Sequence, residues 1–308
     1  MKKDVWAKET HWRNNAEGSK QVNFESFIND IVNNKWNVYG VEVYEKGMLH
    51  KYGDTCENKY PIYSATKTIL SIAVGIAYDH GKIDLGKSVL DYIPGKNLSA
   101  MSDIQKRTFE KITLHRLMTM SVDNLPFRPE SDSYLDFSLT CKIQEPENKV
   151  FNYSNISAYL VGVALTNAIE EDAFKYIERN IFKPLQITGA EFSRCPDGYF
   201  YGASGMKLSV HDLSLIGLLL YNKGIYEGQR IVSEKYVDMA TSILQMNREG
   251  GYGYFIWKYR DGFSINGKWK QKCFCLPKEK LIITFLSHIE DGSDDLLHSM
   301  EKNILGIE

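Results

Sequence analysis

The residues of this chain that could do chemistry begin with Ser64 and Lys67, in the segment Ser64-Ala65-Thr66-Lys67. An apolar run follows at residues 69–77 and predicts one buried helix, with Gly81 as its C-terminal cap. Residues three apart share a helical face, so the hydroxyl and the amine are expected to be neighbours. Such an amine can activate a serine for acylation where no histidine acts as the base.

Ser-x-x-Lys alone is a weak signal, because the chain has further copies at Ser204–Lys207 and Ser299–Lys302. Those copies lie in a glycine-flanked loop and in the terminal segment, and we interpret both as structural. Ser64 differs because an apolar helix follows it without a break. The alternative is that Ser64 only begins that helix.

A second candidate group is Tyr153-Ser154-Asn155, the only Tyr-x-Asn among the 19 tyrosines. A phenol with a reference pKa of about 10 is a poor base at neutral pH, and the Lys67 ammonium is expected to lower that pKa. Asn155 can donate to a substrate carbonyl and accept from the lysine amine. Alternatively, Tyr153 precedes a helix over residues 156–169 that Asn155 caps, which is compatible with catalysis.

Composition excludes several classes of protein. The chain has 308 residues and a net charge of −2, so nothing global attracts nucleic acid or an anionic membrane. No segment is long enough to span a membrane, and the polar residues 1–20 lack the apolar centre of a signal peptide. These features predict a cytoplasmic protein that acts on a small molecule, with its oligomeric state open.

The cysteines predict free thiols in a reducing compartment, because their number is odd and four are widely scattered. Cys273-x-Cys275 has no second cluster with metal-ligand spacing, so no metal is expected, and no organic cofactor is implied. The five are Cys56, Cys141, Cys195, Cys273 and Cys275.

The order of elements predicts an α+β fold, because strands lie at both ends of the chain and helices between them. One antiparallel sheet of N- and C-terminal strands, flanked by helices, would carry an inserted all-helical subdomain. The expected sheet domain covers residues 20–83 and 200–308, and the insertion covers 84–199. Expected strands are at 36–50 (a hairpin turning at 45–47), 252–259, 263–265, 272–276 and 281–286. Expected helices are at 64–80, 112–118, 156–169, 173–181, 208–221 (capped by Ser209 and Asp212), 231–240 and 294–304.

With these motifs in order, the chain resembles the β-lactamase-related serine hydrolases, which comprise class C β-lactamases, DD-peptidase penicillin-binding proteins and related esterases and amide hydrolases. The resemblance covers about residues 25 to 290 and implies a β-lactamase/transpeptidase-like fold. It implies Ser64 as nucleophile, with Lys67 and Tyr153 moving protons and Asn155 positioning substrate. The matching segments are 64–67, 81–85, 89–94, 112–121, 153–155, 205–219 and 228–233.

The third motif of that family, Lys-Thr-Gly or a histidine variant, is absent from this chain. Its expected position holds Ile265-Asn266-Gly267 followed by Lys268. The glycine of that motif is present as Gly267, and glycine lets a backbone approach substrate closely. Ile265 replaces a side chain that helps to hold a substrate carboxylate, so recognition of β-lactams is in doubt. Lys268 or Lys270 could substitute, or both could be solvated loop lysines.

By the same resemblance, the backbone N–H groups of Ser64 and Lys268 form the oxyanion hole, which needs no particular side chain. The hypothesis is therefore a serine hydrolase that forms an acyl-enzyme on a small ester, amide or lactam. Carboxylesterase or amidase is favoured over β-lactamase, with DD-peptidase last; the rival is a binding or sensor module without turnover. Which of Lys67 and Tyr153 is the resting base stays open.

A serine–histidine triad is not expected. The sequence has no Gly-x-Ser-x-Gly elbow, and we interpret His115, His211 and His288 as structural.

Overall fold

The structure, a computed structural model, describes residues 22–99, 101–143 and 146–307. The polar segment 1–20, on which the prediction of no signal peptide was based, lies outside the described residues. Among the helices that are described, none has both the length and the apolar character needed to cross a bilayer.

One antiparallel sheet joins the two ends of the chain, as predicted. Its strand order is β2-β1-β10-β9-β8-β7. The N-terminal β1 pairs with the C-terminal β10 in a register that sets Val41 opposite Phe285 and Val43 opposite Ile283. The strands are β1 (Val38–Glu45), β2 (Met48–Gly53), β7 (Trp257–Tyr259), β8 (Gly262–Gly267), β9 (Gln271–Leu276) and β10 (Leu281–Ser287).

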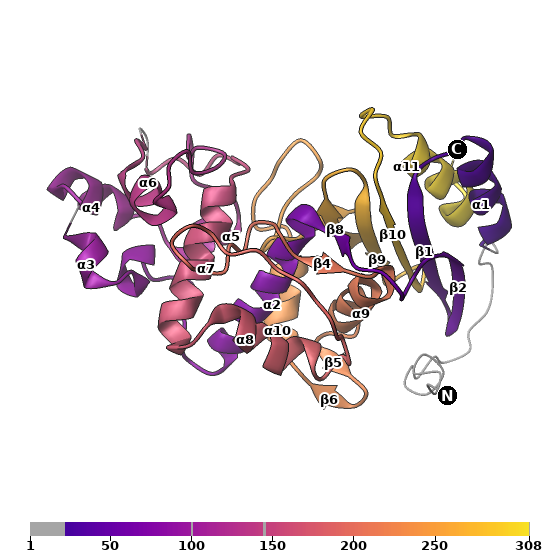
Figure 1. Cartoon of the computed structure of the whole chain (residues 1–308), viewed down its shortest axis with the longest axis horizontal. Helices are drawn as coiled ribbons and strands as arrows, with labels where there is room; N and C mark the ends of the chain where they lie inside the picture. Colours follow the sequence, from indigo (N-terminus) through magenta and orange to yellow (C-terminus); the bar gives the residue numbers. More distant parts are fainter. Residues whose placement is uncertain (1–21, 100, 144–145, 308) are drawn as a thin grey trace.

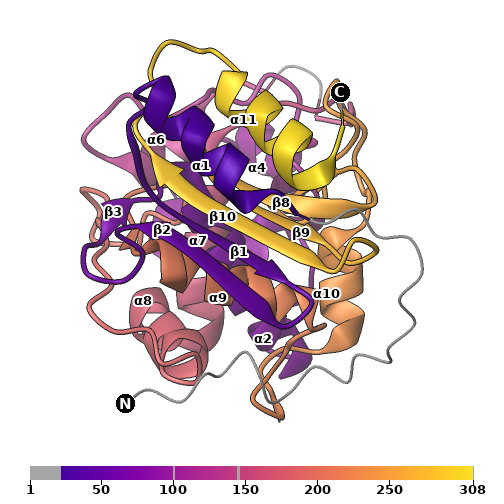
Figure 2. The ribbon, with the colours of Figure 1, turned by 90° about the vertical axis from the view of Figure 1, so that its right-hand side faces the viewer.

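Two helices from opposite ends of the chain cover one face of this sheet (Figure 2). They are α1 (Phe24–Asn33) and α11 (Asp295–Met300), which continues as a π-helical turn, η5 (Glu301–Leu305). Phe27, Ile31 and Met300 are buried with Phe285 of the sheet. Burying such side chains stabilises the fold by about 2 kcal/mol each. The helix α1 was not predicted, although Phe24, Phe27 and Ile31 have helical spacing.

The opposite face carries α2 (Thr66–Asp79) and α9 (Val210–Tyr221) (Figures 1 and 2). Every residue of α2 from Thr66 to Ala77 is buried, which explains why its sequence is apolar on all sides. α9 approaches the sheet so closely that a Cβ at Gly217 would lie 2.4 Å from Cys273 Sγ. The predicted capping box of Ser209 and Asp212 is present at its start. All five cysteines are free, as expected.

Helices and loops between α2 and α9 lie beyond this layer. In Figure 1, α3, α4 and α6 lie at the end of the molecule away from α1 and α11. The predicted division into a sheet domain and an inserted helical subdomain stays a prediction. These elements are η3 (Val89–Tyr92), α3 (Gly95–Leu98), α4 (Asp103–Phe109), α5 (Leu114–Met118), α6 (Tyr134–Thr140), α7 (Asn155–Ile169), α8 (Ala173–Ile177) and the π-helical turn η4 (Glu178–Phe182).

The remaining elements are short and connect these layers. Two of them, β3 and β4, are distant in the chain but pair antiparallel, and β3 lies just before the Ser64 turn. They are β3 (Tyr60–Pro61), η2 (Tyr63–Ala65), β4 (Lys207–Leu208), β5 (Ile225–Tyr226), β6 (Gln229–Arg230) and α10 (Glu234–Thr241).

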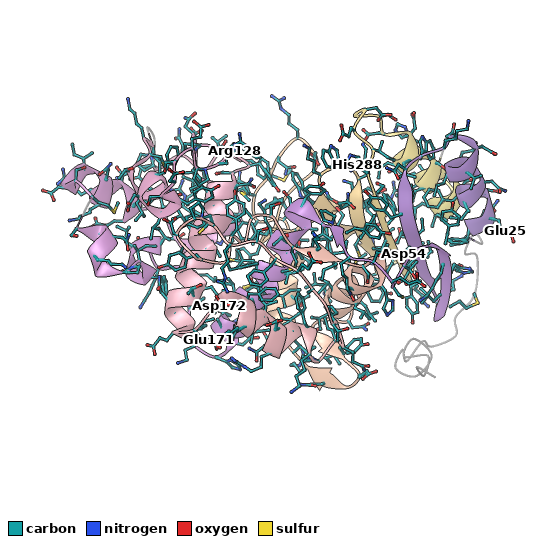
Figure 3. All side chains as sticks on the ribbon, viewed as in Figure 1. Glu25, Asp54, Arg128, Glu171, Asp172 and His288 are labelled. Carbon is teal, nitrogen blue, oxygen red and sulfur yellow. The ribbon has the colours of Figure 1, made fainter. Side chains whose placement is uncertain are left out.

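The predicted strand over 252–259 is wrong for its first part, because only Trp257–Tyr259 forms β7. Tyr252 instead makes isolated bridges to Gln245 and Trp257, and the backbone from Tyr252 to Ile256 folds into turns. The alternating aromatic residues there pack against the segment that carries Tyr153 (Figure 3 draws all side chains).

Candidate active site

Ser64 lies in η2, a 3-10 helix of one turn that comes immediately before α2. Tyr63, the residue before it, has a positive φ of 48°, which is a strained conformation for a tyrosine. This backbone bend delivers Ser64 to the first turn of the buried helix, with Lys67 one turn further on. The Lys67 amine donates to Ser64 Oγ at 3.1 Å.

Lys67 is buried, and its hydrogen-bond partners among the described residues are all uncharged. Its side chain is 1% exposed. Besides Ser64, its Nζ donates to Asn155 Oδ1 and to the carbonyl oxygen of Ala203, both at 2.7 Å. Burial lowers the pKa of the amine from 10.5 to about 7, because no carboxylate repays the desolvation of its charge. The amine is therefore substantially neutral at physiological pH. A neutral –NH2 group has two N–H bonds, so in this form Nζ donates to Asn155 and Ala203 and turns its lone pair to Ser64 Oγ.

Tyr153 lies beside this pair. Lys67 Nζ is 5.0 Å from the centroid of its ring. Burial raises the pKa of the Tyr153 phenol to about 12, while hydrogen bonding to Ser64 acts in the opposite direction. The prediction that Lys67 lowers this pKa is wrong, since a buried amine that loses its own charge cannot stabilise a phenolate. The phenol stays protonated at neutral pH.

Asn155 is the first residue of α7, and Ser154 caps that helix by accepting from the N–H of Ile156 at 3.1 Å. Asn155 itself donates its backbone N–H to the Phe127 carbonyl at 2.6 Å. Its side-chain oxygen is therefore held toward Lys67. The alternative that Asn155 caps this helix is therefore wrong, because Ser154 is the cap and Asn155 the first helical residue.

The end of β8 runs past the Ser64 turn. A Cβ at Gly267 would lie 2.2 Å from the Ile62 carbonyl oxygen, so only glycine permits this approach. The backbone N–H of Lys268 follows directly in the tight turn that joins β8 to β9. Ile265 is fully buried in the core on the α2 side of the sheet. It therefore offers a substrate neither charge nor accessible surface.

Gly267→Ala is expected to disrupt the site, because its Cβ meets backbone that cannot move away. We expect a loss of about 2–4 kcal/mol in unfolding free energy and of most serine reactivity. Chemical denaturation and active-site labelling measure the two effects. Gly95→Ala is the matched control, since a Cβ at Gly95 meets nothing within 4 Å. Normal stability and reactivity in Gly267→Ala would show that β8 does not crowd the Ser64 turn.

Lys268 and Lys270 are the candidate replacements for the missing cation of the third motif, and neither lies in a formed site for a substrate carboxylate. Lys270 forms an ion pair with Asp294 at 2.5 Å. Lys268 is exposed, and its ammonium lies 4.2 Å from the centroid of the Trp269 ring. Trp269 in turn packs edge-on against Tyr63, with the ring centroids 5.0 Å apart. Lys270 is thus paired with a carboxylate, whereas Lys268 forms no ion pair with a described residue.

The histidines have contacts that suit a structural role. His115 Nδ1 hydrogen-bonds to the Tyr254 hydroxyl at 2.8 Å. His288, labelled in Figure 3, follows β10 and contacts Glu290 at 2.6 Å. Within the described part of the chain, no hydrogen bond of Ser64 or Lys67 involves a histidine.

One group of side chains outside this site has metal-ligating types. Ligand atoms of Glu42, Cys56 and His211 lie within 4.8 Å of one another. Glu42 is buried, and its carboxylate already contacts His211 Nδ1 at 3.1 Å and Lys51 Nζ at 3.2 Å. These two contacts lower the pKa of Glu42 against the opposing effect of burial. An ion pair and a hydrogen bond thus account for the buried carboxylate.

Sequence reasoning missed three parts of the site. The Ala203 carbonyl that binds Lys67 is a backbone group and leaves no side-chain signal. The strain at Tyr63 shows only in the backbone. Trp257, which stacks on Tyr153 with ring centroids 5.7 Å apart, lies in a region predicted only as strand.

The fold and the family can now be stated together. The model of the family described as Beta-lactamase matches residues 30–302, and the chain belongs to that family. Its sheet, flanking helices and Ser64 turn are the β-lactamase/transpeptidase-like fold predicted from the sequence. No curated protein matches the chain.

Solved structures with this fold resemble the chain at low sequence identity. A protein from Bacteroides dorei, provisionally called a beta-lactamase, superposes with a TM-score of 0.73 at 15% identity over 93% of this chain and 99% of its own. A provisional 6-aminohexanoate-dimer hydrolase from Bacillus anthracis gives 0.73 at 19% identity over 89% and 79%. A D-stereospecific amidohydrolase from Streptomyces gives 0.70 at 16% identity over 94% and 100%. At these identities the likeness shows the fold alone.

Proposed function

We propose that this protein is a serine hydrolase that cleaves a small ester or amide through an acyl-enzyme on Ser64. The observation that carries the proposal is the contact between Ser64 Oγ and a buried amine whose pKa is about 7. A neutral amine at this distance can accept the hydroxyl proton, and a protonated one cannot. The amidohydrolase and dimer hydrolase among the structural neighbours support an amide or ester as the bond cleaved.

The steps follow from where the protons can go. Lys67 accepts the proton of Ser64 as Oγ attacks the substrate carbonyl carbon. The N–H groups of Ser64 and Lys268 hold the oxyanion that forms, each contributing about 3 kcal/mol to the barrier reduction. Tyr153, a protonated phenol, passes a proton to the departing oxygen or nitrogen and regains one from Lys67. Water then attacks the acyl carbon as Lys67 takes up one of its protons, and that proton passes to Ser64 Oγ as the carboxylic acid leaves.

Lys67 is the resting base in this scheme, and Tyr153 is the proton relay. The pKa of Lys67, about 7, suits a base near neutral pH. The pKa of Tyr153, about 12, keeps its phenol protonated, as a proton relay requires. Asn155 fixes Lys67 through its side-chain oxygen and offers its amide N–H to the substrate.

The substrate class is narrowed by Ile265. A buried isoleucine replaces the cation that would hold a β-lactam carboxylate, so esterase or amidase activity is favoured over β-lactamase activity. Hydrolysis of nitrocefin is therefore expected to be at least about 100-fold less efficient than hydrolysis of p-nitrophenyl esters or short amino-acid amides.

Tyr153→Phe tests the proton relay. We expect kcat for amide substrates to fall by about 10²–10³, because an amine leaving group needs a proton, with KM little changed. For esters with good leaving groups, kcat should fall less. Tyr252→Phe is the matched control, since it removes a buried hydroxyl from the same aromatic cluster. An equal effect on amides and on p-nitrophenyl esters would contradict the relay.

A further inference from the structure

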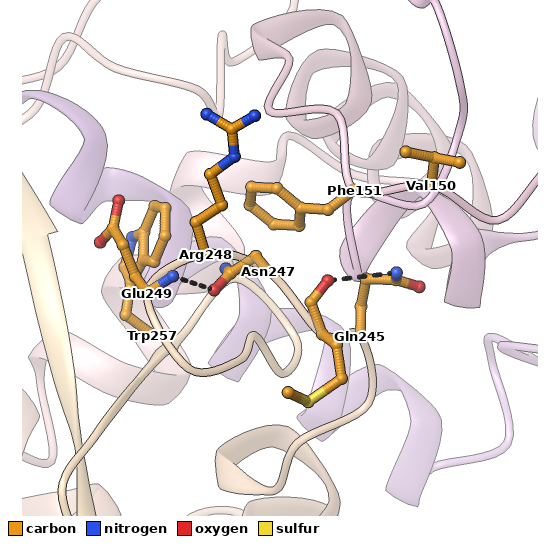
Figure 4. A pocket seen from close by; sticks show the side chains of 8 residues that line it. Val150, Phe151, Gln245, Asn247, Arg248, Glu249 and Trp257 are labelled. Atoms are coloured by element: carbon orange, nitrogen blue, oxygen red, sulfur yellow. Dashed lines mark hydrogen bonds between the residues drawn. The ribbon is translucent and has the colours of Figure 1, made fainter.

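A hollow of about 650 Å³ lies between Phe151, Trp257 and the loop that carries Arg248 (Figure 4). Part of its wall is apolar, and Val150 and Met246 are 54% and 63% exposed in it. Apolar side chains left open in this way commonly mark a binding surface. Its lining comprises Val150, Phe151, Gln245, Met246, Asn247, Arg248, Glu249 and Trp257.

An aromatic wall connects this hollow to the reactive serine. Trp257 lines the hollow and also stacks on Tyr153, with the two rings inclined by 26°. Phe151 packs against Trp257 with centroids 5.8 Å apart. The hollow thus begins one aromatic ring away from the phenol that lies beside Ser64.

The rim of the hollow, residues 245–251, is a firmly held loop. Gln245 Nε2 donates to the Lys149 carbonyl at 3.0 Å and so ties the loop to the segment carrying Phe151. Asn247 Oδ1 accepts the N–H groups of Glu249 at 2.9 Å and Gly251 at 3.0 Å. Side chains on this loop therefore have defined positions relative to Trp257.

The rim carries an unpaired cation. Arg248 is exposed and forms no ion pair with any described residue. In Figure 4 its side chain extends beside Phe151, while the Glu249 carboxylate lies by Trp257. Lys149, next to Val150 in the chain, is a second exposed cation. Arg248 and Glu249 balance each other in charge within residues 245–251, and Lys149 adds a second cation beside the hollow.

We propose that this hollow binds the leaving group of the substrate, and that Arg248 selects leaving groups that bear a carboxylate on an apolar or aromatic body. This proposal rests on the proposed function, because Tyr153 sets the direction in which the leaving group departs. The group that receives a proton from this phenol must leave on the side of Tyr153, which is the side of Trp257 and the hollow. A guanidinium binds a carboxylate by two parallel hydrogen bonds, which suits it to this selection.

The test compares two acetate esters of equal shape, 4-carboxyphenyl acetate and its neutral analogue 4-carbamoylphenyl acetate. We expect wild type to prefer the carboxylate ester about tenfold in kcat/KM, mainly through KM. Arg248→Gln should bring that ratio close to one, and Glu249→Gln should increase it. Arg107→Gln, at an exposed arginine of α4 outside the hollow, is the matched control and should keep the wild-type ratio.

Binding of the two leaving groups gives a readout that does not depend on turnover. Titration of the Ser64→Ala protein with 4-hydroxybenzoate and with 4-hydroxybenzamide should show the same tenfold preference, lost in Ser64→Ala/Arg248→Gln. A wild-type ratio of one, a ratio unchanged in Arg248→Gln, or loss of preference in Arg107→Gln instead would overturn the proposal. Neutral-ester turnover without preference refutes only this inference, whereas absence of all turnover and serine labelling refutes the proposed function.

Discussion

Ser64→Ala is expected to lower kcat/KM for p-nitrophenyl esters by at least about 10⁴, because no other group can take up the acyl chain. The fold should survive, since Ser64 Oγ serves only as a small acceptor for Lys67. Steady-state kinetics with intact mass measurement after fluorophosphonate treatment checks both reactivity and its site. Wild type should gain one adduct, and the variant none.

Ser299→Ala is the matched control, because Ser299 belongs to another Ser-x-x-Lys segment. Its hydroxyl donates to Asp30 at 2.7 Å on the far face of the sheet. Full activity and labelling are expected there, with about 1 kcal/mol lost from stability. Activity that persists in Ser64→Ala would refute the acyl-enzyme. A well-folded wild type that takes no label would favour the binding or sensor module.

Lys67→Arg has the second large expected effect, a loss of about 10³ or more in kcat/KM. A guanidinium can donate the same hydrogen bonds but cannot give up its proton near neutral pH. Arginine thus keeps hydrogen-bond donors at position 67 but removes the neutral form that can accept the Ser64 proton. Retention of more than about a tenth of the activity would show that position 67 is not the base.

Lys67→Met tests the same lysine through the pH dependence of the unfolding free energy. The pKa of Lys67 is about 7 in the folded state and near 10.5 when unfolded. Between these values the unfolded chain binds the extra proton, so wild-type stability rises with pH by up to about 1.4 kcal/mol per unit. The methionine variant lacks this dependence, so its stability relative to wild type should fall from pH 7 to pH 10. Parallel urea-unfolding curves across that range would contradict a buried neutral lysine.

Local spacing made part of this site predictable. Ser64 and Lys67 are three residues apart on one helix, so their contact follows from helix geometry alone. The sheet was predictable because strands at both chain ends were apolar and short, and the family resemblance carried the remaining topology. The helix α1 was missed although Phe27 and Ile31, both buried, have the spacing that indicates it.

The sequence could not show which of the site's side chains are buried. Nothing in the spacing of Tyr153 and Lys67 shows that both are removed from water, and this reverses the direction predicted for the phenol pKa. The same holds for the Ala203 carbonyl and for Trp257, which are brought to Lys67 and Tyr153 by tertiary packing. Their positions required the assembled fold.

The rate at which a fluorophosphonate labels wild-type Ser64, followed from about pH 5 to about pH 9, tests the central claim most directly. The reagent does not titrate, so its rate reports the protonation state of the base next to Ser64. We predict a rate that rises with pH, reaches half its maximum near the Lys67 pKa of about 7, and stays level above it. A pH-independent rate, or a rate that still climbs toward pH 9, would contradict a neutral Lys67 as the group that activates Ser64.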